Sequence, residues 1–276
     1  MTDETRATAA YYDAPEVGRY FSALWGGEDA HIGLYEGAAT IAQAANAIID
    51  KMATMVPGLA KGGRVLDLGA GYGGAMRRLV QRFPIEAVCL NLSAVQNREN
   101  VARTVEAGLA DRLHVVGGSF EAVPLRNEAV DVVWSEDALL HAHDYDAVAR
   151  EMMRVLKPGG HVMLTDILAE EGADAGALAP IGLRLNVPRF RTVSEIEAAL
   201  TAAGLEMGPF VPLGEHLEIH FRRVAAALEA MRDRLVADGT PQEAIDRIAA
   251  GANDWIAAAS DGHLAWGIVR AHKPGH

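Results

Sequence analysis

The chain has 276 residues, half of them apolar, and a formal net charge of −12 at pH 7. This length is enough to bury the core of one large domain, and the composition is typical of a globular protein rather than a disordered one. The negative charge makes a nucleic-acid backbone a poor partner, and the lack of an apolar run of membrane-spanning length argues against a membrane protein.

Two further features favour a cytoplasmic protein. Cys89 is the single cysteine, so no disulfide can form within the chain, as is usual in a reducing compartment. The N-terminus Met1-Thr2-Asp3-Glu4-Thr5 is polar and acidic, unlike a signal peptide. We therefore expect cytoplasmic localisation.

Aromatic residues are frequent in the N-terminal part of the chain. A helix over Tyr11 to Trp25 is predicted, because apolar residues recur there at i, i+3, i+4 and i+7, namely Val17, Tyr20, Phe21 and Leu24. The loop from Trp25 to Tyr35 is rich in aromatic and acidic residues, and an amphipathic helix follows over Thr40 to Met55. Either this region is a packed surface helix and turn, or it is a lid that shields a bound cofactor from water.

The stretch from Arg64 to Ala75 carries the clearest motif. Val65 to Leu68 reads as a buried parallel strand, four glycines follow, and Met76 to Phe83 reads as a helix. The spacing Asp-Leu-Gly-Ala-Gly-Tyr-Gly is that of the first motif of S-adenosylmethionine (SAM)-dependent methyltransferases. No Lys-Ser or Lys-Thr follows the glycines, which argues against a P-loop. The alternative is an ordinary strand-to-helix turn of an α/β protein.

The second predicted strand, Ile85 to Leu92, ends without the acid that binds ribose hydroxyls in many nucleotide-binding folds. Asn91 stands at that position, and its amide can bind a diol without charge assistance. Gln96 and Asn97 begin the next helix, which Ser93 caps, and their amides can help to bind the ribose hydroxyls. The absent carboxylate argues against a nicotinamide dehydrogenase.

The third and fourth predicted strands, Leu113 to Val116 and Ala129 to Trp134, end in polar segments. After the third strand, Ser119 can bond the adenine edge and Phe120 can pack on its face. After the fourth, His141 is the best-placed titratable residue, although a histidine on a surface helix is the alternative. Glu136 and Asp137 can hold a ligand's ammonium group or simply start a helix.

The C-terminal half continues the alternation of helices and strands. The expected elements are a helix over Tyr145 to Leu156, a strand over His161 to Leu168, a loop-rich segment over Glu170 to Arg191, a helix from the capping box Thr192-Val193-Ser194-Glu195 to Ala203, a strand over Glu206 to Leu213, helices over His216 to Ala237 and Pro241 to Ala259, and a last strand over Leu264 to His272. Arginines in the loop-rich segment, Arg184 among them, can bind a substrate carboxylate or lie solvated on the surface.

The chain resembles the glycine/sarcosine and sarcosine/dimethylglycine N-methyltransferases that make glycine betaine, and more distantly phosphoethanolamine and tocopherol methyltransferases. The resemblance covers nearly the whole chain and rests on Trp25 to Tyr35, Asp67 to Gly74, Asn91 to Ser93 with Val95 to Asn97, Gly118 to Phe120, Trp134 to Ala138 with His141, and Trp255 and Trp266-Gly267. In that family the acid of the second strand is likewise an Asn. The stretch Val187 to Arg191 departs from the family, which leaves the methyl acceptor open.

The resemblance implies an α/β fold with the Rossmann-like, seven-stranded, mainly parallel sheet of class I methyltransferases and helical lid additions. We expect one domain over residues 1–276, with a lid at about 11–56, a core at about 62–212, a helical insertion at about 214–260 and a final strand at about 264–272. SAM would be the cofactor and S-adenosylhomocysteine the product. The expected cofactor-binding residues are Asp67, Gly69, Ala70, Gly71, Asn91, Leu92, Gln96, Ser119, Phe120 and Ser135.

The expected reaction is N-methylation of a small amine or amino acid, with His141 as the proton acceptor and no metal. The expected substrate residues are Tyr12, Trp25, Glu136 and Arg184. Two alternatives stay open: an O- or C-methyltransferase of a larger metabolite, and a non-catalytic SAM-binding protein. A small molecule is the expected partner, without nucleic acid or membrane, and the oligomeric state is left open.

Overall fold

The computed structural model describes residues 8, 10, 12, 13, 24, 25, 28–187 and 189–275. Most of the helix predicted over Tyr11 to Trp25, including Val17, Tyr20 and Phe21, therefore lies outside the described residues. So do Gly26 and Gly27 of the following loop, and Pro188. No helix among the residues described has both the length and the apolar character needed to cross a bilayer.

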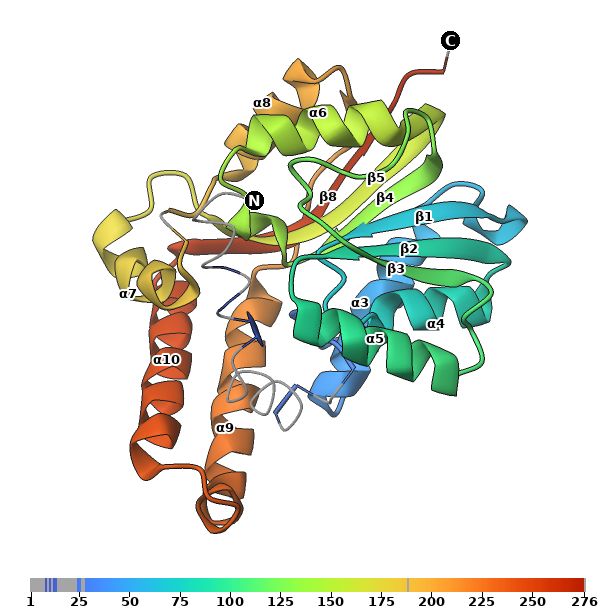
Figure 1. The fold of residues 1–276 in the computed structure, drawn as a ribbon. Helices are drawn as coiled ribbons and strands as arrows, with labels where there is room; N and C mark the ends of the chain where they lie inside the picture. Colours follow the sequence, from blue (N-terminus) through green and yellow to red (C-terminus); the bar gives the residue numbers. More distant parts are fainter. Residues whose placement is uncertain are drawn as a thin grey trace.

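A central sheet organises the fold, with strand order β3-β2-β1-β4-β5-β8-β6 (Figure 1). The first five strands in this order run parallel, and β8 is antiparallel to β5. The strands are β1 (Gly63–Leu68), β2 (Ile85–Asn91), β3 (Leu113–Gly117), β4 (Val130–Glu136), β5 (Leu156–Ala169), β6 (Glu206–Met207), β7 (Val211–Pro212) and β8 (Leu264–His272). The expected α/β fold with a mainly parallel sheet is confirmed.

The single strand predicted over Glu206 to Leu213 is two short strands in the structure. Both β6 and β7 pair with β8, so the described sheet has eight strands where seven were expected. The interruption falls at Pro209, which has no N–H to donate to a ladder. Gly208 still donates its N–H to the Arg270 carbonyl at 2.9 Å, so the segment stays against β8.

Helices cover both faces of the sheet, which explains why strands such as Val65–Leu68 are apolar at every position but one. On one face lie α3 (Ile41–Thr54), α4 (Gly74–Arg82) and α5 (Ala94–Glu106). On the other lie α6 (Tyr145–Val155) and α8 (Val193–Ala202), as Figure 1 shows. Each face has its own buried apolar cluster, with Met52 and Met76 in the first and Val148 and Met152 in the second.

Helices α9 (Glu215–Ala237) and α10 (Gln242–Ser260) form an antiparallel pair that extends beyond the sheet (Figure 1). Between β5 and α8 the structure has a helix, α7 (Ala175–Leu185), where the sequence predicted a loop. Gly176, Pro180 and Gly182 suggested a loop, but Asp174 caps the helix by accepting the Gly176 N–H at 2.8 Å. The helix ends at Asn186, whose φ is +54°.

Candidate functional site

The turn between β1 and α4 depends on glycine at two positions. Gly69 has φ +85°, and a Cβ there would lie 2.3 Å from the Cβ of Ala138, so only glycine fits. Gly71 has φ +51°, and a Cβ there would meet no protein atom within 4 Å. The N–H groups of Gly69 and Ala70 donate to the Leu90 carbonyl at 2.8 and 3.1 Å, which fixes the turn to β2. The backbone of Gly71 therefore borders open space.

That space is a pocket at the carboxyl ends of β1, β2 and β4. It lies at the topological switch point between β1 and β4, from which successive strands are added in opposite directions across the sheet. It encloses about 890 Å³, including the part open to solvent, and we call it the glycine-turn pocket. Eight of the ten residues predicted to bind the cofactor line it, namely Asp67, Gly69, Ala70, Gly71, Asn91, Leu92, Gln96 and Phe120.

Ser119 and Ser135 do not line this pocket. The buried Ser135 hydroxyl donates to the Leu68 carbonyl at 2.6 Å, so it joins β4 to β1. The Ser119 hydroxyl accepts the Glu121 N–H at 3.1 Å. Both hydroxyls therefore bond to backbone beside the pocket, Ser135 between two strands and Ser119 in the segment after β3.

The amides at the end of β2 bond to each other. Asn91 Nδ2 donates to Gln96 Oε1 at 3.0 Å, and Asn97 Nδ2 donates to the Asn91 carbonyl at 3.1 Å. The Gln96 N–H in turn donates to the Ser93 hydroxyl, the predicted cap of α5. The amides of Asn91 and Gln96 are therefore held in place along one wall of the pocket.

Acidic residues from two distant segments meet beside His31 in the lining of the same pocket. His31 Nε2 lies 3.8 Å from Glu136 Oε2 and 4.0 Å from Asp29 Oδ1. Burial opposes its charging, but Glu136 and Asp29 raise the pKa of His31 to about 9. Burial raises the pKa of Glu136 to about 7 and that of Asp67 well above its ordinary value. Such a group of carboxylates suits a ligand ammonium.

Glu136 lines the glycine-turn pocket, so the structure places this predicted substrate residue beside the predicted cofactor residues. Asp137, the next residue, has φ +49°, a conformation that costs free energy outside glycine. Its carboxylate accepts the Ile32 N–H at 2.7 Å and the Trp266 indole N–H at 2.8 Å. Asp137 therefore fixes the N-terminal loop against β4 and β8.

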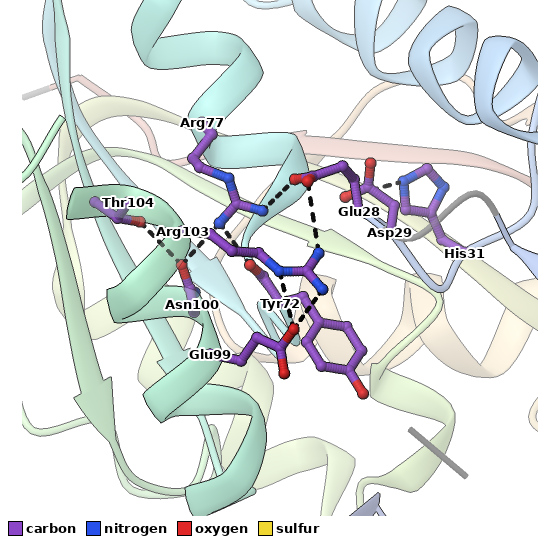
Figure 2. Close-up of polar contacts among 9 residues, drawn as sticks. All are labelled: Glu28, Asp29, His31, Tyr72, Arg77, Glu99, Asn100, Arg103 and Thr104. Atoms are coloured by element: carbon purple, nitrogen blue, oxygen red, sulfur yellow. Dashed lines mark hydrogen bonds and ion pairs between the residues drawn. The ribbon is translucent and has the colours of Figure 1, made fainter. Parts of the chain in front are cut away.

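A second set of contacts fixes the same loop to α4 and α5, and Figure 2 shows its members. Arg77 is buried and forms an ion pair with Glu28, while Arg103 lies 3.5 Å from the same carboxylate. Arg77 also donates to the Tyr72 carbonyl at 2.6 Å and to Asn100 Oδ1 at 3.1 Å. We call these contacts of Glu28 with Arg77 and Arg103 the Glu28 cluster.

His141 lies at the end of a short 3₁₀ helix, Leu139–His141, that follows β4. Its Nε2 lies 2.8 Å from the Tyr12 hydroxyl, and its Nδ1 has no hydrogen-bond partner among the described residues. Burial, with a contribution from His143, lowers the pKa of His141 to about 4. The imidazole is therefore neutral at physiological pH.

A second cavity opens on the other side of His141 and encloses about 1,410 Å³, including the part open to solvent. We call it the aromatic cavity, because Trp25, Phe221 and Trp255 line it. Of the described residues, four border both this cavity and the glycine-turn pocket, namely Tyr12, Ala30, Asp137 and His141. The structure thus places His141 where two ligand spaces meet.

Three predicted substrate residues, Tyr12, Trp25 and Arg184, line the aromatic cavity. Arg184 forms an ion pair with Asp254 of α10, so its charge is already matched. Phe221, Arg247 and Trp255 also line the cavity, and the sequence analysis did not single them out as site residues. Trp255 belonged to the family resemblance, but the role of helices α9 and α10 as cavity walls follows from the tertiary fold.

Comparison with known proteins gives consistent results. Residues 66–164 match the family described as a methyltransferase domain. The sarcosine/dimethylglycine N-methyltransferase of Aphanothece halophytica is 37% identical over 265 residues, which span 96% of this chain and 95% of that protein. The dimethylglycine N-methyltransferase of Parasynechococcus marenigrum is 38% identical over 271 residues, 97% of this chain and 95% of the relative. A crystal structure from Galdieria sulphuraria, assigned as a sarcosine dimethylglycine methyltransferase, matches with TM-score 0.86 and 33% identity over 93% of this chain and 98% of its own.

Proposed function

Since the chain belongs to the sarcosine/dimethylglycine N-methyltransferase family, we propose that it methylates the nitrogen of a small N-methylated amino acid, with sarcosine and dimethylglycine as first candidates. The enzyme is a SAM-dependent methyltransferase. The proposal about the acceptor and the site rests on one observation. The glycine-turn pocket and the aromatic cavity meet at Tyr12, Asp137 and His141.

The residues of the glycine-turn pocket suit SAM. Its open space beside Gly71 can hold a ligand against the backbone, and its buried carboxylates can bind an ammonium group. We expect Asn91 and Gln96 to contact the ribose, and Phe120 to pack on the adenine. Bound SAM supplies a methyl group activated by its sulfonium.

The acceptor nitrogen must be neutral before it can attack a methyl group. Neutral His141 can accept its proton at Nδ1 when Nε2 carries the other proton toward the Tyr12 hydroxyl. Asp137 holds the N-terminal loop in place, and an acceptor that packs against the apolar walls would displace water from them. Alignment and dehydration would then supply most of the rate enhancement.

A product-mass screen tests this proposal. The purified protein is incubated with methyl-labelled SAM and a panel of amines, N-methyl amino acids and phenols. We expect label in the N-methyl amino acids. Label in phenols alone would favour O-methylation, and SAM binding without any labelled product would identify a non-catalytic SAM-binding protein.

A further inference from the structure

Two buried polar atoms in the lining of the glycine-turn pocket have no hydrogen-bond partner among the described residues. They are Nε2 of His31 and Oε1 of Glu136, whose side chains are each 5% exposed. His31 Nε2 lies 3.8 Å from the other carboxylate oxygen of Glu136. A buried polar group without a hydrogen bond costs free energy, so a ligand that bonds to both atoms would be favoured here.

The imidazole of His31 is oriented by its own loop. Its Nδ1 lies 2.9 Å from the Ile32 carbonyl, and because a carbonyl oxygen only accepts, Nδ1 donates this hydrogen bond. The Ile32 N–H is in turn held by Asp137 at 2.7 Å. The pKa of about 9 places a second proton on Nε2 at neutral pH. His31 therefore offers an N–H and a positive charge to the pocket, which suits an anionic group.

Several other acids of the pocket already serve protein groups. Asp137 accepts two hydrogen bonds, and Glu28 forms the Glu28 cluster with two arginines, as Figure 2 shows. Asp29 accepts the Ala75 N–H at the start of α4. Of the carboxylates that line the pocket in the described part of the chain, Glu136 is the one with a buried oxygen that has no hydrogen-bond partner. This oxygen suits a cationic group of a ligand.

An α-amino acid matches the pair of His31 and Glu136. It carries an ammonium and a carboxylate on one carbon, so the groups that bind them must lie close together, as these two side chains do at 3.8 Å. Ammonium beside Glu136 and carboxylate beside His31 would place unlike charges next to each other. Both side chains are buried, so salt would screen these attractions little. SAM carries such an amino-acid end.

We propose that His31 and Glu136 bind the amino-acid end of SAM, with Nε2 of His31 donating to its carboxylate and Oε1 of Glu136 accepting from its ammonium. The inference rests on the proposed function, because it assumes that SAM occupies the glycine-turn pocket. It moves Glu136, expected from the sequence as a substrate residue, from the acceptor to the cofactor. It also gives the N-terminal loop, which carries His31, a direct part in cofactor binding.

Truncated ligands test the inference by titration calorimetry, which measures binding without turnover. The ligands are S-adenosylhomocysteine, its decarboxylated analogue, its deaminated analogue, and methylthioadenosine, which lacks both groups. In the parent, removal of either group should raise Kd at least about tenfold, a factor equal to about 1.4 kcal/mol. A hydrogen bond to a charged group contributes at least this much.

Each variant should lose the effect of one group. In His31→Leu, the ratio of Kd for the decarboxylated analogue to Kd for S-adenosylhomocysteine should fall at least about fivefold, and more than the ratio for the deaminated analogue. Glu136→Gln should show the reverse pattern. His31→Gln keeps a side-chain N–H and should recover part of the first ratio, which a purely structural role would not produce. If His31→Leu does not fold, His31→Gln and Glu136→Gln decide.

His216 supplies a matched control. It is as buried as His31, accepts the Tyr35 N–H of the same loop at 3.1 Å, and does not line the pocket. His216→Leu should therefore leave both ratios as in the parent. Binding of methylthioadenosine shows in every variant that the rest of the pocket is intact.

The outcomes separate the inference from the proposed function. Unchanged ratios in the His31 and Glu136 variants overturn the inference and leave SAM binding intact. Equal falls in His31→Leu and His216→Leu also overturn it, because His31 would then only anchor the loop. If the parent binds none of the four ligands, the proposed function fails and the inference with it. The crossed pattern supports both.

Discussion

The Tyr12 hydroxyl lies 2.8 Å from Nε2 of His141, although 129 residues separate the two along the chain. Tyr12 belongs to the N-terminal segment and His141 to the turn after β4, and both border the glycine-turn pocket and the aromatic cavity. Their contact joins the N-terminal segment to the point where donor and acceptor are expected to meet. A hydrogen bond at Nε2 also selects which nitrogen of the imidazole can face the acceptor.

The first prediction concerns the low-pH limb of activity. His141 has its pKa lowered to about 4 by burial and His143, so it stays neutral down to that pH. If it accepts the acceptor's proton, kcat/KM, which reports the free enzyme, should have its low-pH limb near pH 4, well below the ordinary histidine value near 6.5. His141→Ala should lose roughly 10²–10⁴-fold in kcat.

Two variants sharpen this measurement. His141→Gln can hydrogen-bond Tyr12 but cannot accept a proton, so its pH profile isolates the base role. The exposed His114 of β3 lies outside both pockets, and His114→Gln should match the parent. Full activity and an unaltered profile in His141→Gln would assign the histidine an orienting role only.

The second prediction concerns which arginine binds the acceptor's carboxylate. The sequence favoured Arg184, but Arg184 is paired with Asp254, whereas Arg247 has no ion pair among the described residues. Arg247→Ala should therefore raise the acceptor KM more than Arg184→Ala does. Charged hydrogen bonds contribute about 1.5–3 kcal/mol, and exposure brings this toward 1 kcal/mol, or about fivefold in KM.

Both variants should leave the KM for SAM unchanged, since neither arginine lines the glycine-turn pocket. Arg234→Ala removes an exposed arginine of α9 outside both pockets and serves as the control. A larger rise of the acceptor KM in Arg184→Ala than in Arg247→Ala would show that Arg184 binds the acceptor's carboxylate.

Local signals in the sequence predicted much of this fold. The capping box at Thr192 forms as expected, with Glu195 Oε2 accepting the Thr192 N–H at 3.0 Å. The last strand has the predicted bounds, Leu264–His272. Such features depend on residues a few positions apart, so their patterns can be read directly. Helix α7 was missed because its glycines and proline outweighed the cap at Asp174.

Features that depend on distant contacts could not be predicted. The ion pair of Arg77 with Glu28 spans 49 residues, and the bond of Asp137 to Trp266 spans 129. The Ser135 hydroxyl was expected at the cofactor, but the neighbouring strand brings the Leu68 carbonyl within 2.6 Å. Periodicity gives the apolar face of a helix, whereas the cavity that α10 borders exists only once α9 packs beside it.

The third prediction uses the open space at Gly71. Gly71→Val should abolish SAM binding, because the branched side chain would enter the glycine-turn pocket and resist φ +51°. Titration calorimetry measures the binding. Gly262 also has positive φ, +74°, and open space around it, so Gly262→Val carries the same backbone penalty away from the pocket. Loss of binding in both variants would point to misfolding, and SAM binding by Gly71→Val would exclude this turn as the cofactor site.

The fourth prediction tests the Glu28 cluster. Arg77→Met keeps the apolar stem but removes the ion pair with Glu28 and leaves the Tyr72 carbonyl without this donor, while Asn100 Oδ1 keeps the Thr104 hydroxyl as a donor. The loss of these charged hydrogen bonds should cost about 1.5–3 kcal/mol of unfolding free energy. Arg232→Met removes ion pairs at the surface of α9 and should cost at most about 1 kcal/mol. Urea unfolding gives both values. Equal losses in the two variants would show that Arg77 contributes no more than a surface arginine.

The last prediction concerns stability above neutral pH. Glu136 and Asp29 raise the pKa of His31 to about 9, against about 6.5 in the unfolded chain. The folded protein therefore binds a proton that the unfolded chain lacks between these values. The stabilisation is complete below pH 6.5 and is lost as pH rises through 9, by up to about 1.4 kcal/mol per pH unit.

The pH window for this measurement follows from the neighbours of His31. Glu136 has a pKa near 7, and the lowered pKa values of His141 and His220 act below 6.5, so the window from pH 7.5 to 9 avoids these three groups in the parent. Burial also raises the pKa of Asp67, so His31 is compared with a variant and not taken from the parent slope alone. Urea unfolding across this window should show a steeper loss in the parent than in His31→Gln. Burial also raises the pKa of the Cys89 thiol, so this group contributes to the pH dependence of stability. Its contribution cancels when the slope of unfolding free energy against pH for His31→Gln is subtracted from that of the parent. His114→Gln should keep the parent slope, and equal slopes in the parent and His31→Gln would mean that folded His31 is neutral.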